Sequence, residues 1–275
     1  MRKFIAILLF FSFFLAPYTV WAWEEIKGEH FIIYYLEQKP FAEDVLSQAE
    51  RYYRQIASDL GYSRNSNFWT WDKRVKIYIY TDQQSFLAAT NQPLWSQGLA
   101  DYTNKMIISY NWNKGFSESL LPHEIAHLIF RDFVGFKGEV PLWLDEGVAQ
   151  WSELPKRSIS KSVARSYLKK RAFLPLIELT KLTQEGLKEL DQNQKNRPML
   201  SNPETIQDSP INIFYLQAAS LVGFLIERYG TDSFAEFCRK LRDGSSLNQA
   251  LTSAYSAHIS GIEELQERWL AYLRS

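Results

Sequence analysis

Two histidines and a glutamate stand close together in the segment LPHEIAHLIF, as His123, Glu124 and His127. The two histidines are four positions apart, slightly more than one helical turn, and the apolar residues around them recur at helical spacing. Both imidazoles therefore project from one helix face and can bind a single zinc ion, with Glu124 beside them as a general base. The alternative is an ordinary amphipathic helix that carries two histidines.

A hydrolytic zinc site needs a third protein ligand and one open position. The H-x-x-G-x-x-H extension that supplies a third histidine in metzincins does not follow His127. Three downstream carboxylates are candidates: Asp132, Glu139 and Glu146. Asp132 falls on the same helix and points away from its ligand face, and Glu139 falls in a glycine-containing connector. Glu146 is better placed, because PLWLDEGVAQW can begin a second helix at Pro141 whose apolar residues pack against the first helix.

These segments resemble the gluzincin zinc metallopeptidases, in which H-E-x-x-H is completed by a glutamate on the next helix. Eighteen residues separate His127 from Glu146, and WLDEGVAQWSE is similar to the W-L-N-E-G segment of the aminopeptidase N group, with Asp145 in place of Asn. The resemblance implies one Zn²⁺ per chain, held by His123, His127 and Glu146. It also implies that Glu153, seven residues after Glu146, orients a zinc-binding imidazole. A surface carboxylate is the alternative for Glu153.

The resemblance extends to bacterial peptidase MA-like domains through a strand-helix-strand start and the closing segment ISGIEELQERWLAYL. It implies peptide-bond hydrolysis, in which Glu124 assists the attack of a zinc-bound water and a hydrogen-bond donor stabilises the oxyanion. Tyr215 is the candidate donor, because IFYLQAASLVGFLIERYG resembles the tyrosine-bearing helix that follows the site in this superfamily. Tyr229 and His258 stay as rivals, and a core role is the alternative for Tyr215. No G-A-M-E-N segment precedes HEIAH, which favours an endopeptidase over an aminopeptidase.

Two other functions fit the same residues. A zinc hydrolase can act on a non-peptide amide or ester, and an inactive envelope binding or assembly module can keep the fold without turnover. The presence of Glu124 argues against the inactive module. For a peptide or protein substrate, GLADYTNKMIISY predicts an edge strand beside the site, to which an extended peptide can add backbone hydrogen bonds. His30 begins a strand and has no partner at ligand spacing, which indicates a structural role.

The elements that must position these residues change character along the chain. Strands are predicted at 30–36, 75–80 and within 97–110, and helices at 41–60, 85–90 and 116–133. After Pro141, helices are predicted near 141–153, 158–171, 211–229, 232–242, 246–255 and 261–274. Residues 191–210 are polar, contain three prolines, and predict an exposed loop. The fold expected is α+β and zincin-like: a small mixed sheet with the HEIAH helix in 23–140, then a mostly helical part, 141–275, with the third zinc ligand.

The first 22 residues have the pattern of a signal peptide: a basic start, an apolar run at 4–16, and small residues before a cleavage position at Ala22. We expect cleavage there, with a retained anchor as the alternative, and a soluble periplasmic or secreted protein without stable membrane insertion. The chain carries 31 Lys plus Arg and 31 Asp plus Glu, so no net charge favours nucleic acid as a partner. Its single cysteine, Cys238, is expected in the core and excludes an intramolecular disulfide.

Overall fold

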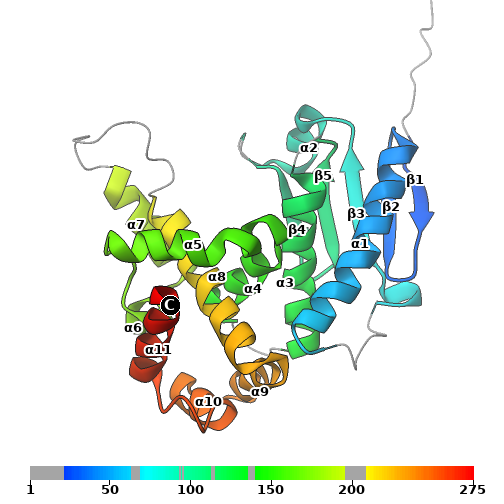
Figure 1. The fold of residues 1–275 in the computed structure, drawn as a ribbon. Helices are drawn as coiled ribbons and strands as arrows, with labels where there is room; N and C mark the ends of the chain where they lie inside the picture. Colours follow the sequence, from blue (N-terminus) through cyan, green and yellow to red (C-terminus); the bar gives the residue numbers. More distant parts are fainter. Residues whose placement is uncertain are drawn as a thin grey trace, which may run out of the picture.

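The computed structural model (Figure 1) describes residues 22–62, 69–92, 94, 96–112, 115–135, 140–195 and 209–275. Residues 1–21 of the predicted signal peptide, Glu139, and most of the predicted loop 191–210 lie outside these ranges. In the described part, a five-stranded mixed sheet comes first and helices follow. The predicted α+β fold, with its small sheet and its mostly helical second half, is therefore confirmed.

The sheet half ends in the helix that carries the two histidines. Its elements are β1 (Glu24–Lys27), β2 (Phe31–Tyr35), α1 (Lys39–Asp59), the 3₁₀ turn η2 (Trp71–Lys73), β3 (Val75–Tyr80), α2 (Gln83–Thr90), β4 (Gly98–Asp101), β5 (Met106–Tyr110), the π-helical turn η3 (Phe116–Leu120) and α3 (Leu121–Val134). The strand order is β1-β2-β3-β5-β4, in which β2, β3 and β5 run parallel and the outer two strands are antiparallel to their neighbours. Among the described strands β4 pairs with β5 alone, so β4 is an edge strand.

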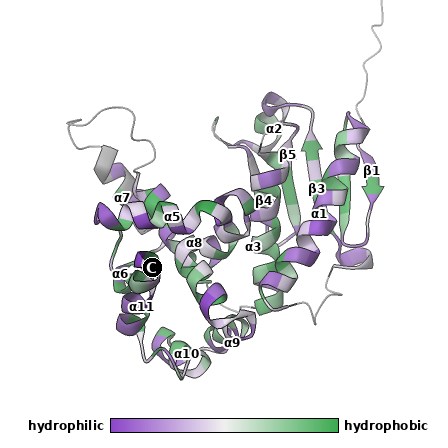
Figure 2. Ribbon diagram, in the orientation of Figure 1, coloured by the Kyte–Doolittle hydropathy of each residue, from purple (hydrophilic) through white to green (hydrophobic). Residues whose placement is uncertain are grey.

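Alternating side chains build the buried face of the sheet. In β2 and β3 every second residue is buried, as the period of a strand with one covered face requires. Helix α1 contacts β2 and packs against α3, so the HEIAH helix is held against the sheet through α1. Figure 2 shows hydrophobic segments in β3 and β5 at the centre of this half.

The helical half is organised around one long apolar helix. Its elements are α4 (Leu142–Ser152), α5 (Leu154–Lys169), α6 (Leu176–Leu179), α7 (Gln184–Lys195), α8 (Pro210–Tyr229), α9 (Thr231–Arg242), α10 (Leu247–Ala254) and α11 (Ile262–Arg274). Helix α8 contacts α4, α5, α7, α9 and α11. It is the one described helix long and apolar enough to cross a membrane, and 61% of its apolar window is buried inside the protein. Burial in the core therefore accounts for its apolar composition.

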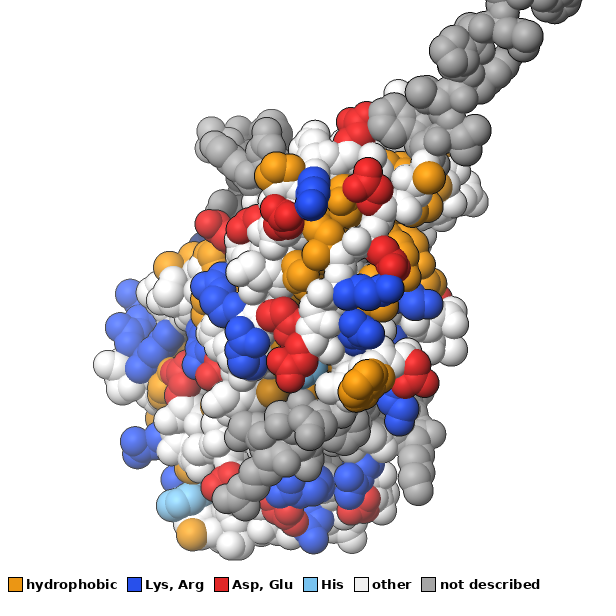
Figure 3. Space-filling view, turned by 90° about the vertical axis from the view of Figure 1, so that its right-hand side faces the viewer, with side chains coloured by type: hydrophobic (Ala, Val, Ile, Leu, Met, Phe, Trp, Pro, Cys, Tyr) orange, Lys and Arg blue, Asp and Glu red, His pale blue; other side chains and the backbone are white. Residues whose placement is uncertain are grey.

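Several elements differ from the sequence prediction. The stretch 97–110 is a hairpin, with β4 and β5 joined by a turn at 102–105, and the predicted helix 158–171 begins earlier, at Leu154. The elements β1, α6 and α7 were not predicted. Strand β1 and helix α6 have four residues each, too few for a periodic pattern, and α7 is so polar that 191–195 were assigned to the loop. On the face seen in Figure 3, acidic and basic side chains are interspersed.

Candidate metal centre

Helix α3 presents both histidines on one face. Pro122 stands in the first turn of α3, where proline's lack of an N–H costs no helical hydrogen bond. Gly135 ends the helix in the left-handed region at φ 65°. The Nε2 atoms of His123 and His127 lie 3.1 Å apart, and the planes of the two rings are inclined at 78°. The four-residue spacing in the sequence thus brings the two ring nitrogens to one point.

Helix α4 brings Glu146 to the same point. Trp143, Leu144 and Val148 are buried and fix this helix between α3 and α8. Gly147 lies so close to α8 that a Cβ there would stand 2.7 Å from the carbonyl oxygen of Ala218. The absence of a side chain at position 147 therefore sets how near α4 approaches α8, and with it the position of the adjacent Glu146.

The three donor atoms have the separation that zinc requires. Glu146 Oε2 lies 3.9 Å from His123 Nε2 and 3.7 Å from His127 Nε2, and one ligand atom of each residue lies within 4.8 Å of the others. Ligands at about 2.0 Å from a tetrahedral zinc are about 3.3 Å apart. Two imidazole nitrogens and one carboxylate oxygen are also a common donor set of catalytic zinc. The residues present therefore fit a zinc ion.

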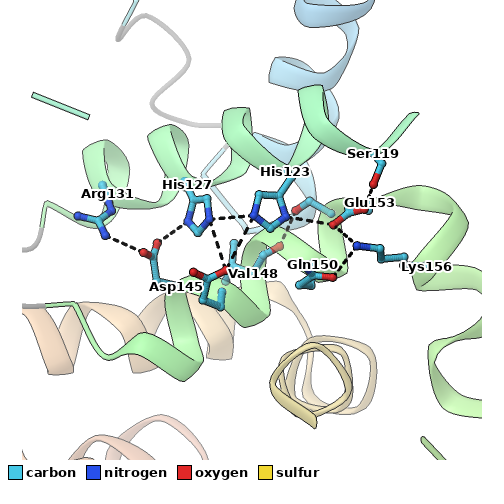
Figure 4. Close-up of polar contacts among 11 residues, drawn as sticks. Ser119, His123, His127, Arg131, Asp145, Val148, Gln150, Glu153 and Lys156 are labelled. Atoms are coloured by element: carbon cyan, nitrogen blue, oxygen red, sulfur yellow. Dashed lines mark hydrogen bonds and ion pairs between the residues drawn. The ribbon is translucent and has the colours of Figure 1, made fainter. Parts of the chain in front are cut away.

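A buried carboxylate accepts a hydrogen bond from each imidazole at its far nitrogen (Figure 4). Asp145 Oδ1 lies 2.9 Å from His127 Nδ1, and Glu153 Oε1 lies 3.0 Å from His123 Nδ1. An ionised carboxylate can only accept hydrogen bonds, so Nδ1 of each ring carries a proton, and a ring without a second proton presents a lone pair at Nε2. Two lone pairs that face each other at 3.1 Å repel unless a proton or a metal ion is shared between them.

A cation lies behind each of these carboxylates. Arg131 Nη2 donates to Asp145 Oδ2 at 2.7 Å, and Lys156 Nζ donates to Glu153 Oε1 at 2.8 Å. The hydroxyl of Ser119, from η3, also donates to Glu153. Each imidazole is thus held by a carboxylate whose other hydrogen bonds fix that carboxylate in place, and Figure 4 shows the two sets extending in opposite directions from the histidines.

Three carboxylates surround His127 with negative charge. Burial by itself would lower the pKa of His127, but the charge and hydrogen bond of Asp145, with the charges of Glu146 and Glu124, raise it to about 9. Burial raises the pKa of Glu146 above its ordinary value, although the two histidines oppose this shift. The ligand position on His127 therefore attracts cations strongly, as a metal site must.

Both outer carboxylates stay ionised in spite of burial. Burial would raise the pKa of Asp145, but His127 and Arg131 lower it. Burial would likewise raise the pKa of Glu153, and its hydrogen bond to His123 with the charge of Lys156 lowers it. Glu153 has the orienting contact that the sequence resemblance implied, although it stands in extended backbone just after α4 ends at Ser152.

Glu124 and Tyr215 interact electrostatically. Glu124 adjoins His123 on α3, and its charge acts on His127 and on Tyr215. Burial, followed by the charges of Glu146 and Glu124, raises the pKa of Tyr215 above its ordinary value. A protonated phenol in this position is a hydrogen-bond donor.

The two rivals of Tyr215 lie elsewhere. Tyr229 is 14 residues further along α8, about 21 Å at the helical rise, and its ring stacks on that of His258 at 5.2 Å between centroids. Of the two tyrosines, Tyr215 is the one on which the charges of Glu146 and Glu124 act, whereas Arg268, Arg228 and Glu264 act on Tyr229.

The remaining sequence candidates have structural partners. Asp132 accepts hydrogen bonds from Trp69 Nε1 at 2.7 Å and from Lys105 Nζ at 2.5 Å, away from the two histidines. His30 lies with Glu29 and Glu50 in a second group of possible metal ligands. Both carboxylate oxygens of Glu50, however, already accept hydrogen bonds from His30, one from its backbone N–H and one from Nδ1.

Sequence reasoning missed four residues of the site: Ser119, Arg131, Asp145 and Lys156. Asp145 was recorded only as a replacement for Asn, although a carboxylate next to a ligand on a buried helix face was a usable signal of an imidazole partner. Arg131, four residues after His127, lies on the same helix face and was a signal of the same kind. Lys156, three residues after Glu153 at the start of α5, was a local signal of an ion pair, whereas Ser119 reaches Glu153 from η3, which no local pattern reveals.

No family model matches the chain, and no curated protein matches it. Among solved structures, the chain is similar to two crystal structures of the M1 zinc metallopeptidase from Deinococcus radiodurans, one of them of a point mutant. The TM-score is 0.46 for both, and the sequence identities are 17% and, for the mutant, 16%. Each match covers 90% of this chain and 50% of that chain, so this chain spans about half the length of that enzyme.

Proposed function

We propose that this protein is a zinc-dependent metallopeptidase. One observation carries the proposal: His123 Nε2, His127 Nε2 and Glu146 Oε2 converge within zinc-ligand distance, while a buried carboxylate orients each imidazole at Nδ1. A structural pair of histidines has no need of two such carboxylates. An array that fixes both the tautomer and the direction of each lone pair supports metal binding.

The residues around the ligands supply the rest of a hydrolytic mechanism. A bound zinc ion supplies a Lewis acid that acidifies water and polarises a carbonyl. Glu124 accepts the proton of the attacking water and returns it to the leaving amine. Tyr215, kept protonated by burial and by its carboxylate neighbours, donates a hydrogen bond to the oxygen that becomes negative as the carbonyl is attacked.

An extended peptide is the substrate form that the surroundings favour. Among the described strands β4 has one unpaired edge, and Tyr102, just after β4, lies against His127 with 5.6 Å between ring centroids. A peptide that adds to β4 would therefore run toward the ligands. We propose an endopeptidase rather than an aminopeptidase, because the sequence lacks the G-A-M-E-N segment that captures a free amino terminus. We also propose export, on the signal-peptide pattern of the first 22 residues.

Zinc content and turnover test the proposal separately. Residues 23–275 should contain about one zinc per chain by elemental analysis, and Glu146→Ala prepared identically should lose most of it. Glu124→Gln should keep the zinc and lose hydrolysis of an unstructured protein substrate. Protein that takes up no zinc even when supplied with it would refute the enzyme. Zinc binding with cleavage of ester or amide probes but not of peptides would favour a non-peptide hydrolase, and biological activity that survives Glu124→Gln would favour the binding module.

A further inference from the structure

We propose that a cavity between α5 and α8 selects the substrate, and that its occupant is a bulky apolar side chain next to the scissile bond; this inference rests on the proposed peptidase function. The cavity has a volume of about 250 Å³. Apolar cavities of about 150 Å³ hold a benzene molecule, so this one has room for the side chain of Phe, Leu or Met.

One face of each helix forms the walls. Ile159 and Val163 are four residues apart on α5, and Tyr215, Leu216 and Ala219 recur at three- and four-residue intervals on α8. Residues at these intervals share one side of a helix. The two apolar faces oppose each other because α5 packs against α8.

The cavity lies beside the metal centre, because Lys156 both lines it and donates to Glu153, the carboxylate that holds His123. Tyr215 lines the cavity, and the charges of Glu146 and Glu124 act on it. Gln150, one helical turn after Glu146 on α4, and Lys156 at the start of α5 also line it. Figure 4 shows Gln150 and Lys156 beyond His123, on the side away from Arg131. A substrate whose scissile carbonyl lies near Tyr215 can therefore place a neighbouring side chain between α5 and α8.

Both cations that line the cavity are already paired. Lys156 Nζ donates to Glu153 and, at 2.8 Å, to Gln150 Oε1. Arg157 Nη1 donates to Asp59 Oδ2 at 2.6 Å, and its guanidinium lies 3.7 Å from the ring centre of Trp151. With these charges neutralised, an acidic side chain gains little in the cavity. An apolar side chain binds favourably there, because its own surface and the apolar walls are both removed from water.

The exposure of Ile159 is a second observation in favour of an apolar occupant. Ile159 lines the cavity and its side chain is 54% exposed. An exposed apolar side chain that borders an apolar cavity extends the surface that a ligand can cover.

Two serines on α5 provide a matched pair of variants. Ser160 lines the cavity and Ser162 does not, while each hydroxyl donates to the carbonyl oxygen three residues earlier. Ser160→Phe should fill the cavity, and Ser162→Phe places the same ring on the exposed side of the helix. Circular dichroism and zinc content should be unchanged in both, which excludes misfolding as the cause of any difference.

The first measurement is cleavage of a mixed peptide library by residues 23–275 and by both variants. The unmodified protein should prefer Phe, Leu or Met at one fixed position beside the scissile bond. Ser160→Phe should lower kcat/KM for those peptides at least tenfold and shift the preference at that position toward Ala and Gly. Apolar pockets discriminate by about this factor for a single methylene group. Ser162→Phe should leave the preference unchanged. An unaltered preference in Ser160→Phe, or a preference for acidic residues, would overturn the inference.

A binding measurement separates this inference from the proposed function. N-acetyl-phenylalaninamide is titrated into the same three proteins by calorimetry, with N-acetyl-aspartamide as the acidic comparison. If the unmodified protein binds the phenylalanine probe and Ser160→Phe does not, the cavity is supported even without peptide cleavage. Only the proposed peptidase function would then be refuted. Peptide cleavage with equal probe binding by all three proteins would overturn the cavity alone. No probe binding and no cleavage would overturn both.

Discussion

The pairing of each ligand histidine with a buried carboxylate and a cation determines how well the site can bind metal. In the W-L-N-E-G segment that this sequence resembles, an uncharged Asn occupies the position of Asp145. Here the carboxylate adds a full negative charge 2.9 Å from His127, and Arg131 keeps that carboxylate ionised. A more negative partner makes the imidazole a stronger base and hence a stronger ligand.

We therefore expect Asp145→Ala to weaken zinc binding by roughly 10- to 100-fold, the usual cost of losing an imidazole's orienting partner. Asp145→Asn keeps an oxygen that can accept from His127 Nδ1 and should lose much less. Competition with a chromogenic zinc chelator measures both affinities. Arg131 is 38% exposed in its side chain, so removal of Asp145 leaves it access to water and should not unfold the protein. Equal affinities in all three proteins would show that Asp145 does not act on the metal.

The raised pKa of His127 predicts how zinc affinity depends on pH. The surrounding carboxylates raise this pKa to about 9, so at neutral pH a proton occupies the imidazole until zinc displaces it. Below pH 9, zinc affinity should rise by about tenfold per pH unit for this one proton, and the rise should level off above pH 9. Zinc titrations at pH 6, 7 and 8 in buffers of different ionisation enthalpy would count the protons released. An affinity that is constant over this range would contradict the prediction.

At the scale of elements, periodicity predicted the long helices and the central strands, and it found α3 and α4 because both carry apolar stripes. The H-E-x-x-H spacing, with the resemblance that indicated Glu146, named three residues whose donor atoms the structure brings together. Helix geometry accounts for the first two. The contact of Ser119 with Glu153 could not be predicted, because Ser119 approaches it from η3. Which side chains meet across elements depends on crossing geometry, and that is absent from local sequence.

The close approach of α4 to α8 should control the position of Glu146. In Gly147→Ala, the added Cβ would stand 2.7 Å from Ala218 O and 2.8 Å from Val222 Cγ2, so the two helices must separate. Overpacking of this kind costs about 1–3 kcal/mol in the free energy of unfolding, more than the roughly 1 kcal/mol that Ala gains over Gly in a helix. Urea denaturation should show lower stability, and zinc affinity should fall as Glu146 shifts.

Gly186→Ala is the matched control for that substitution. Gly186 also lies within a helix, but a Cβ added there would have as its nearest neighbour the flexible end of the Leu182 side chain, at 3.3 Å. This variant should be as stable as the unmodified protein or slightly more stable, with unchanged zinc affinity. If Gly147→Ala behaved like Gly186→Ala, the packing of α4 on α8 would not determine the ligand geometry.

At the scale of the whole molecule, the site joins the sheet half and the helical half of the chain. Two ligands come from α3 at the end of the sheet half, and the third comes from α4 at the start of the helical half. The contact between α3 and α4 is thus both a structural junction and the place where the ligands meet. Any opening of that junction separates Glu146 from the histidines, so metal binding and association of the halves are thermodynamically linked.

Zinc should therefore stabilise the protein across the junction and not only locally. At free zinc 1,000 times the dissociation constant, the free energy of unfolding should rise by about 4 kcal/mol. Hydrogen exchange should slow in α3 and α4, and also in α8, which packs on α4, while β1 at the far edge of the sheet should change little. Glu146→Ala should keep the fold and lose this response, because two histidines on one helix can bind zinc without drawing α4 toward α3. Slower exchange confined to α3 in the unmodified protein would mean that zinc binds there without Glu146, and the three-ligand centre would be wrong.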